Sequence, residues 1–162
     1  MHKLGIMCGV PGSGKSTWLK NNKEDALVIS RDAIRFQLVK ENEEYFSKEK
    51  QVFKTFIKTI QDAINSNITP YEIFVDATHI TKISRDKLLN SLDLSNVEKV
   101  IVYVRHPLES EAIRRNAKRT GRARVPENVI HQMYKNFERP ERDGNKIFDV
   151  IYLETPEYDT YI

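Results

Sequence analysis

An α/β fold with a central, mostly parallel sheet flanked by helices is predicted by two observations. Short apolar runs typical of buried strands alternate with segments whose apolar residues recur at helical spacing. In addition, residues 9–16 read G-V-P-G-S-G-K-S, a complete G-x-x-x-x-G-K-S pattern between an apolar run and a helical segment. Such a pattern follows the first strand of a parallel sheet, so both observations favour the same architecture.

Composition limits the classes of protein to which this chain could belong. Its 162 residues suit one domain with a sizeable core, and 40% apolar with 30% charged residues is an ordinary globular balance. No apolar run approaches the length of a membrane span, and no signal peptide is evident, so we expect a cytoplasmic protein without a membrane partner. The single cysteine, Cys8, is expected in the core. A net charge of +3 is too small to establish a polyanionic partner.

Each element of the predicted fold has its own local signal. Strands are expected at residues 3–8, 26–29, 71–76, 97–104 and 146–153. Helices are expected to open over residues 16–20 and to span residues 32–40, 47–65, 81–92 and 126–136. Ser47 and Thr81 are predicted N-caps, Pro107 suits the first turn of a further helix, and Pro126 opens the last one. Residues 139–144 read as a polar connection and the last residues as a frayed end.

The glycine-rich segment is a phosphate-binding loop (P-loop), and it indicates a P-loop NTPase fold. Its glycines let the backbone turn tightly and aim successive N–H groups at a polyphosphate. Lys15 can reach the β- and γ-phosphates, and the Ser16 hydroxyl can ligate Mg²⁺. ATP, or another nucleoside triphosphate, and Mg²⁺ are therefore the expected cofactors. The predicted nucleotide-binding residues of the loop are Gly9, Pro11, Gly12, Ser13, Gly14, Lys15, Ser16 and Thr17.

Asp32 and Arg35 follow the second expected strand, where the ligands of an open parallel sheet bind. A carboxylate in this place can accept a proton from an attacking hydroxyl, and an arginine one turn further can bind a substrate phosphate with its fork. The alternative is that Asp32 is only an N-cap and Arg35 a surface arginine in a weak ion pair. The P-loop favours the catalytic interpretation.

Asp76 and Thr78 lie at the end of the third expected strand. Asp76 is the natural second carboxylate of the site and would hold Mg²⁺ directly or through water. Thr78 offers a hydroxyl to the acceptor crevice, whereas we interpret His79 as a polar support rather than a catalytic base. Without the P-loop, an acidic residue at a strand end would be read as a turn cap.

A dense basic segment predicts a lid over the donor nucleotide. Arg115 and Arg119 are one helical turn apart, so they share a face that could neutralise a transferring phosphoryl group, and Arg114 and Lys118 share another. We expect a small helical lid over residues 112–133, with residues 120–125 as its irregular part. A track for nucleic-acid phosphates and an exposed solvated helix are the alternatives. Arg122 and Arg124 receive no role.

Four segments together resemble the kinase domain of phage-type polynucleotide kinase. They are the P-loop, S-R-D-A-I-R at residues 30–35, V-D-A-T-H at 75–79 and R-N-A-K-R at 115–119, followed by V-P at 125–126 and M-Y-K at 133–135. The resemblance covers roughly residues 3–137, and the R-D-x-x-R and R-N-x-K-R elements are its selective part. The chain departs from the phage enzyme at D-A-T, because that enzyme carries its acid directly before the threonine.

The resemblance implies a role for each matching residue. Lys15 and Ser16 match the phosphate and metal residues, and Asp32 matches the general base for the 5′-hydroxyl. Arg35 matches the arginine that holds the 3′-phosphate of the acceptor, and Thr78 an acceptor-site threonine. Arg119, and less closely Arg115, match lid arginines on the donor phosphates. Activity as a 3′-phosphatase is not expected.

Three functions remain in consideration from the sequence. The leading expectation is ATP-dependent phosphorylation of the 5′-hydroxyl end of DNA or RNA, in nucleic-acid repair alongside a ligase and, for a phage protein, in the host cytoplasm. The second is a kinase of a small metabolite, nucleoside or nucleotide, which would have less use for Arg35. The third is a nucleotide-dependent switch ATPase, which would not need Asp32. The preference for DNA or RNA and the oligomeric state are not readable from the sequence.

Overall fold

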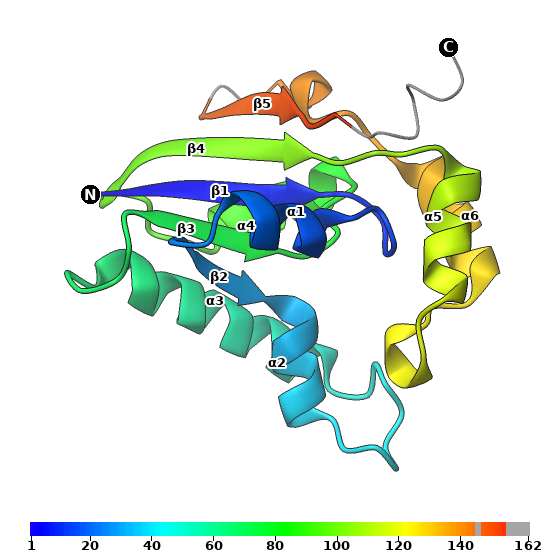
Figure 1. Cartoon of the computed structure of the whole chain (residues 1–162). Coiled ribbons are helices and arrows are strands. Elements are labelled where there is room, and N and C mark those ends of the chain that lie inside the picture. Colours follow the sequence, from blue (N-terminus) through cyan, green and yellow to red (C-terminus); the bar gives the residue numbers. More distant parts are fainter. Residues whose placement is uncertain (145–146, 155–162) are drawn as a thin grey trace.

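The computed structural model describes residues 1–144 and 147–154. Five strands form one sheet in the order β2-β3-β1-β4-β5, and every neighbouring pair is parallel (Figure 1). The α/β prediction with a mostly parallel sheet is therefore confirmed. The strands are β1 (His2–Cys8), β2 (Leu27–Ser30), β3 (Glu72–Asp76), β4 (Val97–Val104) and β5 (Phe148–Tyr152). The expected fraying at the C-terminus and residue 146 of the expected last strand lie outside the described residues.

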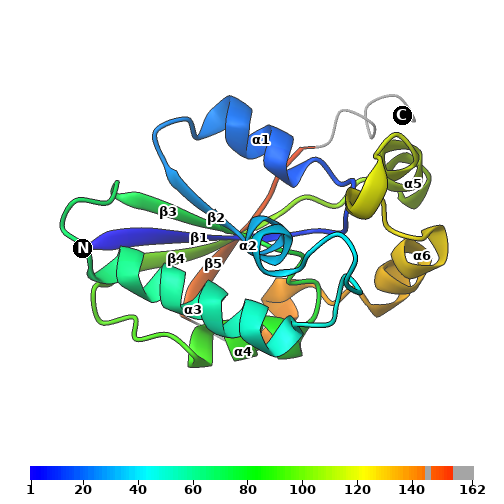
Figure 2. The same cartoon turned by 90° about the horizontal axis from the view of Figure 1, so that it is seen from below.

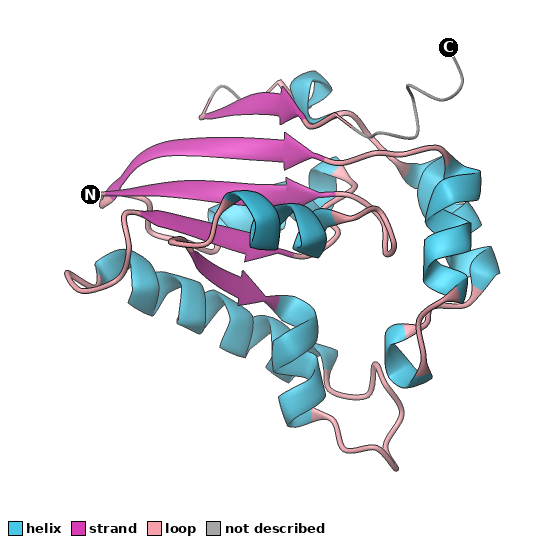
Figure 3. Cartoon of the chain, viewed as in Figure 1, coloured by secondary structure: helices cyan, strands magenta, loops and turns pink. Residues whose placement is uncertain are grey.

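Helices cover both faces of the sheet, as Figures 2 and 3 show. Helix α1 lies on one face, and α3 and α4 lie on the other, while α5 and α6 stand beyond the carboxyl ends of the strands. The helices are α1 (Lys15–Asn22), α2 (Arg31–Leu38), α3 (Glu49–Asn65), α4 (Lys82–Asn90), α5 (Glu109–Ala117) and α6 (Glu127–Asn136), with short 3-10 helices η1 (Gly121–Ala123) and η2 (Pro140–Asp143). Within residues 1–144 and 147–154, no helix is long and apolar enough to cross a membrane.

The alternation of side chains along β1 explains the two-sided core. Leu4, Ile6 and Cys8 join the larger buried cluster with α3 and α4, whereas Met7 joins a smaller cluster on the face that α1 covers. Successive side chains of a strand point to opposite faces, so a central strand needs apolar residues at nearly every position. The expectation that Cys8 is a buried core residue is confirmed, and burial raises the pKa of its thiol to about 11.

The structure corrects two predicted helix starts and confirms a third. Helix α3 begins at Glu49 with Lys48 as its N-cap, so Ser47 is not the cap. Helix α5 begins at Glu109 after Leu108, which places Pro107 before the helix rather than in its first turn. Thr81 is the N-cap of α4, and its hydroxyl accepts a hydrogen bond from the backbone N–H of Ser84 at 3.2 Å. Cap residues occur in many turns, so the type of residue alone locates a helix start poorly.

Candidate active site

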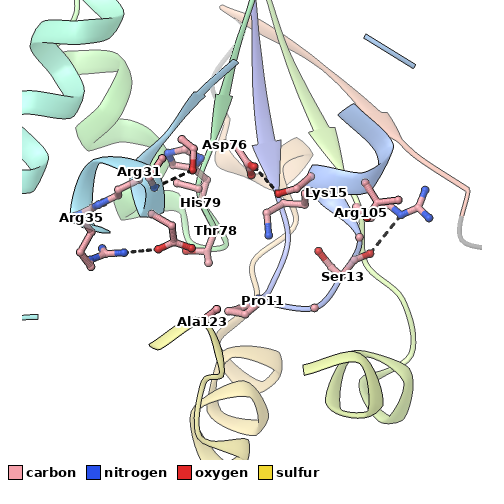
Figure 4. Close-up of a pocket in the computed structure, with 18 of the residues that line it drawn as sticks. Pro11, Ser13, Lys15, Arg31, Arg35, Asp76, Thr78, His79, Arg105 and Ala123 are labelled. Carbon is pink, nitrogen blue, oxygen red and sulfur yellow. Dashed lines mark hydrogen bonds and ion pairs between the residues drawn. The ribbon is translucent and has the colours of Figure 1, made fainter. Parts of the chain in front are cut away.

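A cleft of about 840 Å³ opens at the carboxyl ends of β1, β2 and β3. Figure 4 shows Arg31 and Arg35 on one side of it and Ser13 and Arg105 on the other, with Lys15 and Asp76 between them. Of all the site residues predicted from the sequence, only Gly9 does not line the cleft. Gly9 is buried, and its carbonyl accepts a hydrogen bond from Lys15 Nζ at 2.7 Å. The contact of Gly9 with the nucleotide stays a prediction.

Glycine is required at two positions of the P-loop. Gly12 and Gly14 have φ angles of 83° and 92°, in the left-handed region that other residues rarely adopt. A Cβ at Gly12 would also lie 2.7 Å from the carbonyl oxygen of Ala112 in α5. The loop and the first half of α5 are therefore packed in direct contact.

The donor side of the cleft is built around Lys15. Its ammonium group donates to the carbonyl groups of Gly9 and Val10 at 2.7 and 3.1 Å. Burial lowers the pKa of Lys15, and the negative charge of Asp76 opposes this effect. Ser13 contributes a buried hydroxyl that has no hydrogen-bond partner among the described residues. A buried polar group of this kind is expected to find a partner, and a phosphate oxygen would supply one.

Ser16 and Asp76 meet at the position where a metal ion is expected. The Ser16 hydroxyl donates to Asp76 Oδ2 at 2.8 Å, although the two residues are 60 positions apart in the chain. Both oxygens are hard ligands that suit Mg²⁺. The described residues contain no group of three His, Cys, Asp or Glu side chains that could hold a metal. The pair therefore fits an ion that takes its remaining ligands from substrate phosphates and water, as Mg²⁺ does.

Asp32 and Arg35 form the wall opposite the P-loop. The carboxylate of Asp32 is 60% exposed and binds Arg35 Nη1, as expected for two residues on one helix face. The side chain of Arg35 is only 8% exposed, and Glu49 accepts bonds of 2.6 and 3.0 Å from its Nε and Nη2. The surface-arginine alternative is therefore wrong. Two carboxylates already occupy the arginine fork that was predicted to bind an acceptor phosphate.

Thr78 and His79 follow β3 and contact β1 and the start of the P-loop. The carbonyl of Thr78 accepts a hydrogen bond from the backbone N–H of Gly9 at 2.9 Å. His79 has a φ of 44°, is buried, and its Nδ1 lies 3.0 Å from the carbonyl oxygen of Met7. Burial lowers the pKa of His79 to about 4, so its ring is neutral at pH 7. These contacts give His79 a structural position beneath the site.

Only some of the cationic side chains of the basic segment line the cleft. Arg115, Lys118 and Arg119 line the cleft, and Arg115 Nη1 donates to the carbonyl oxygen of Ser13 at 3.3 Å. Arg114 does not line the cleft; it pairs with Glu111, to which Arg115 Nε also donates at 3.0 Å. The predicted lid of residues 112–133 corresponds to most of α5, η1 and α6, but Ala112 is fixed against the P-loop.

Arg105 also lines the cleft, beside the P-loop, and was not predicted from the sequence. It follows β4 directly and donates through Nε to the carbonyl oxygen of Ser13 at 3.3 Å. Its Nη1 donates to the carbonyl oxygen of Glu154, two residues after β5, at 2.8 Å. The rule that residues after parallel strands reach the ligand, which selected Asp76, would also have selected Arg105. Arg31 and Lys87 line the cleft and were likewise not predicted.

The P-loop, the Ser16–Asp76 pair and the lid cations on a five-stranded parallel sheet define a P-loop kinase fold. Residues 4–140 match the AAA domain family AAA_33. The chain therefore belongs to this family.

Solved structures share the fold at low sequence identity. A gluconokinase from Sinorhizobium meliloti 1021 is 20% identical with a TM-score of 0.59, over 97% of this chain and 86% of that one. A sugar kinase from Janibacter sp. HTCC2649 is 15% identical with a TM-score of 0.63, over 98% and 89%. A chain of the Pnkp1/Rnl/Hen1 RNA repair complex is 20% identical with a TM-score of 0.69, over 83% of this chain and 43% of that one.

Proposed function

We propose that the protein transfers the γ-phosphoryl group of ATP to the 5′-hydroxyl end of a polynucleotide. The observation that carries the proposal is that Asp32, in the wall opposite the P-loop, lines the same cleft as Lys15 and the Ser16–Asp76 pair. A hydroxyl placed between the two walls has a carboxylate on one side and the donor phosphates on the other. Positioning and charge stabilisation of this kind supply most of the catalysis in phosphoryl transfer.

Each residue then has one task in the transfer. The acceptor oxygen forms its bond to the γ-phosphorus as the bond from that phosphorus to the β–γ bridging oxygen breaks, and ADP leaves. Asp32 takes the proton of the acceptor hydroxyl. Lys15, with Arg119 and Arg115 of the lid, stabilises the charge spread over the phosphoryl oxygens. Mg²⁺, held by Ser16 and Asp76, would neutralise part of the donor charge.

The choice of a polynucleotide acceptor rests on the arrangement around Asp32 and on resemblance. The R-D-x-x-R element that resembles polynucleotide kinases lines the wall that we assign to the acceptor, and a chain of an RNA repair complex shares the fold. We propose that Arg35 exchanges Glu49 for the 3′-phosphate of the acceptor and that Thr78 contacts the same acceptor. A ligase would act on the product.

One observation favours a second candidate, a kinase of a small neutral alcohol such as a sugar. The charges of Arg31 and Arg35 are matched by Glu49 and Asp32, so neither of these two arginines presents an unpaired cation to an acceptor. A neutral acceptor needs no such cation. The gluconokinase and the sugar kinase also align over nearly the whole chain.

A single panel of acceptors distinguishes the two candidates. Transfer of labelled γ-phosphate is measured with a 5′-hydroxyl oligonucleotide, a nucleoside 3′-monophosphate, a free nucleoside and a neutral sugar, glucose. The polynucleotide proposal expects the highest kcat/KM for the oligonucleotide and a preference for the 3′-monophosphate over the free nucleoside. Phosphorylation of glucose alone would favour the second candidate. Hydrolysis of ATP without any acceptor, retained after Asp32→Asn, would favour a switch ATPase.

A further inference from the structure

Tyr45, in the segment between α2 and α3, contacts the carboxylate to which we assign the base function. Its hydroxyl donates a hydrogen bond of 3.1 Å to Asp32 Oδ1. Arg35 binds the same oxygen from within α2. Among the described residues, Asp32 Oδ2 has no hydrogen-bond partner. The two contacts therefore fix one carboxylate oxygen and leave the other for the proton of an acceptor.

Three aromatic and cationic contacts hold the Tyr45 ring in place. The ring centroid lies 5.8 Å from that of Phe36 and 4.8 Å from that of Phe46. The guanidinium carbon of Arg35 lies 5.1 Å from the Tyr45 centroid, over the ring. Burial and the negative charge of Asp32 raise the pKa of Tyr45, so its hydroxyl remains a donor at neutral pH. The hydroxyl is therefore a fixed donor beside a carboxylate that is otherwise mostly exposed.

We propose that Tyr45 is a positioning residue for Asp32 and sets the rotamer in which Oδ2 meets the acceptor hydroxyl. An exposed aspartate without a partner samples several rotamers, and ordering it costs conformational entropy. A fixed donor reduces this cost before the acceptor arrives, and placement of the reacting groups controls the rate. The inference rests on the proposed function, because it assumes that Asp32 receives the proton.

A matched pair of variants tests the role of the hydroxyl. Tyr45→Phe keeps the ring and its stacking and removes only the oxygen. Tyr71→Phe is the control, because the Tyr71 hydroxyl also donates to a carboxylate, that of Glu98, at 2.7 Å. Tyr71 directly precedes β3, so it lies at the amino ends of the strands, whereas the cleft lies at their carboxyl ends. We expect Tyr45→Phe to lower kcat about tenfold without changing the KM for ATP. Tyr71→Phe should leave both constants at the parent values, and both variants should keep the parent melting temperature.

A substrate-free measurement separates failure of this inference from failure of the proposed function. The ¹³C carboxyl resonance of Asp32, assigned with Asp32→Asn, is recorded at pH 7 in the parent and in both tyrosine variants. The resonance should shift in Tyr45→Phe only, because this variant loses the hydroxyl that donates to Asp32 Oδ1. The same chemical shift in the parent and Tyr45→Phe, or equal kcat values for the two variants, would overturn the inference. A parent enzyme that phosphorylates glucose but not the oligonucleotide would overturn the polynucleotide proposal, and the Tyr45 comparison would then use glucose as the acceptor.

Discussion

Asp32 stands in the first turn of α2 but does not cap it. Ser30 is the N-cap, and its hydroxyl accepts a hydrogen bond from the backbone N–H of Ala33 at 3.2 Å. The interpretation of Asp32 as a helix cap is therefore wrong, and its mostly exposed carboxylate has no structural task at the helix end. The charge of Asp32 can accordingly be removed while the cap of α2 stays intact.

Asp32→Asn should abolish most of the acceptor phosphorylation while leaving the fold and ATP binding intact. Asparagine keeps the size of the side chain but cannot take a proton, and general bases contribute roughly 10²- to 10⁴-fold to the rate. Turnover is measured with a saturating acceptor, and ATP binding by calorimetry. Because Ser30 caps the helix, the melting temperature should change little. Retention of parent turnover would exclude Asp32 as the base.

Lys15→Ala should lower kcat by a factor of 10² or more, because a donor aimed at developing charge contributes about 3 kcal/mol. The buried ammonium lies at the centre of the P-loop and is anchored by two carbonyl groups. The control is Lys58→Ala, an exposed lysine on α3 that pairs with Asp62. Steady-state kinetics of both variants check the prediction. A loss smaller than tenfold for Lys15→Ala would contradict the assigned role.

At the scale of elements, the lid is tied to the acceptor side by Arg122. This residue belongs to η1, and its Nη1 donates to the carbonyl oxygen of Val39, the C-cap of α2, at 2.7 Å. Its guanidinium carbon lies 4.9 Å from the ring centroid of Phe36. The sequence assigned Arg122 no role, whereas the structure makes it a link between η1 and the end of α2.

Arg122→Ala should loosen the lid without removing a residue that lines the cleft. We expect faster amide hydrogen exchange over residues 119–126 and a raised KM for ATP, with the melting temperature nearly unchanged. Arg124→Ala, two residues away and exposed, is the matched control and should exchange like the parent. Hydrogen-exchange mass spectrometry follows both variants, because it reports local opening. Identical exchange in both variants would show that η1 is held by other contacts.

The sheet was predictable because each strand carries its own apolar run. The starts of β1, β2, β3 and β4 lie within one residue of the expected ones, and the P-loop is a contiguous pattern. The start of β5 cannot be scored in the same way, because residues 145–146 lie outside the described residues.

The partners of the site residues were not predictable in the same way. Glu49 binds Arg35 across 14 positions, and Tyr45 binds Asp32 across 13. Asp143 binds Arg85 across 58 positions, inside a segment that read as a polar connection. Spacings of this kind follow no helical or strand period, so only packing brings the partners together.

At the scale of the whole molecule, a buried charged unit lies beneath the site. Arg85 is fully buried and donates to both carboxylate oxygens of Asp143 at 2.8 Å, to the carbonyl oxygen of His79 at 2.8 Å and to that of Glu138 at 2.9 Å. It thereby joins α4, the turn after β3 and η2. His79, which shares this unit, is buried as a neutral ring and stacks on Phe56.

The folded protein should lose stability in acid because of His79. Its pKa falls from 6.5 to about 4 on folding, so between these values the unfolded chain binds the additional proton. The free energy of unfolding should decline from about pH 6.5 towards pH 4, by about 3 kcal/mol in total. His79→Asn, which tolerates the positive φ, should remove this decline. His131→Asn, a half-exposed histidine of α6, should retain it. Urea titrations at several pH values measure the free energy of unfolding. The same dependence of this free energy on pH in the parent and in His79→Asn would contradict the prediction.

The central place of β1 in the sheet has a consequence for biosynthesis. The P-loop leaves the ribosome before β3 and β4, which flank β1 and end only at residues 76 and 104. A nascent chain that stops short of residue 104 carries the nucleotide-binding motif on a strand that lacks at least one of its neighbours. Affinity for ATP should therefore emerge only once the chain beyond residue 104 is free to fold, well after its recognition motif has been made.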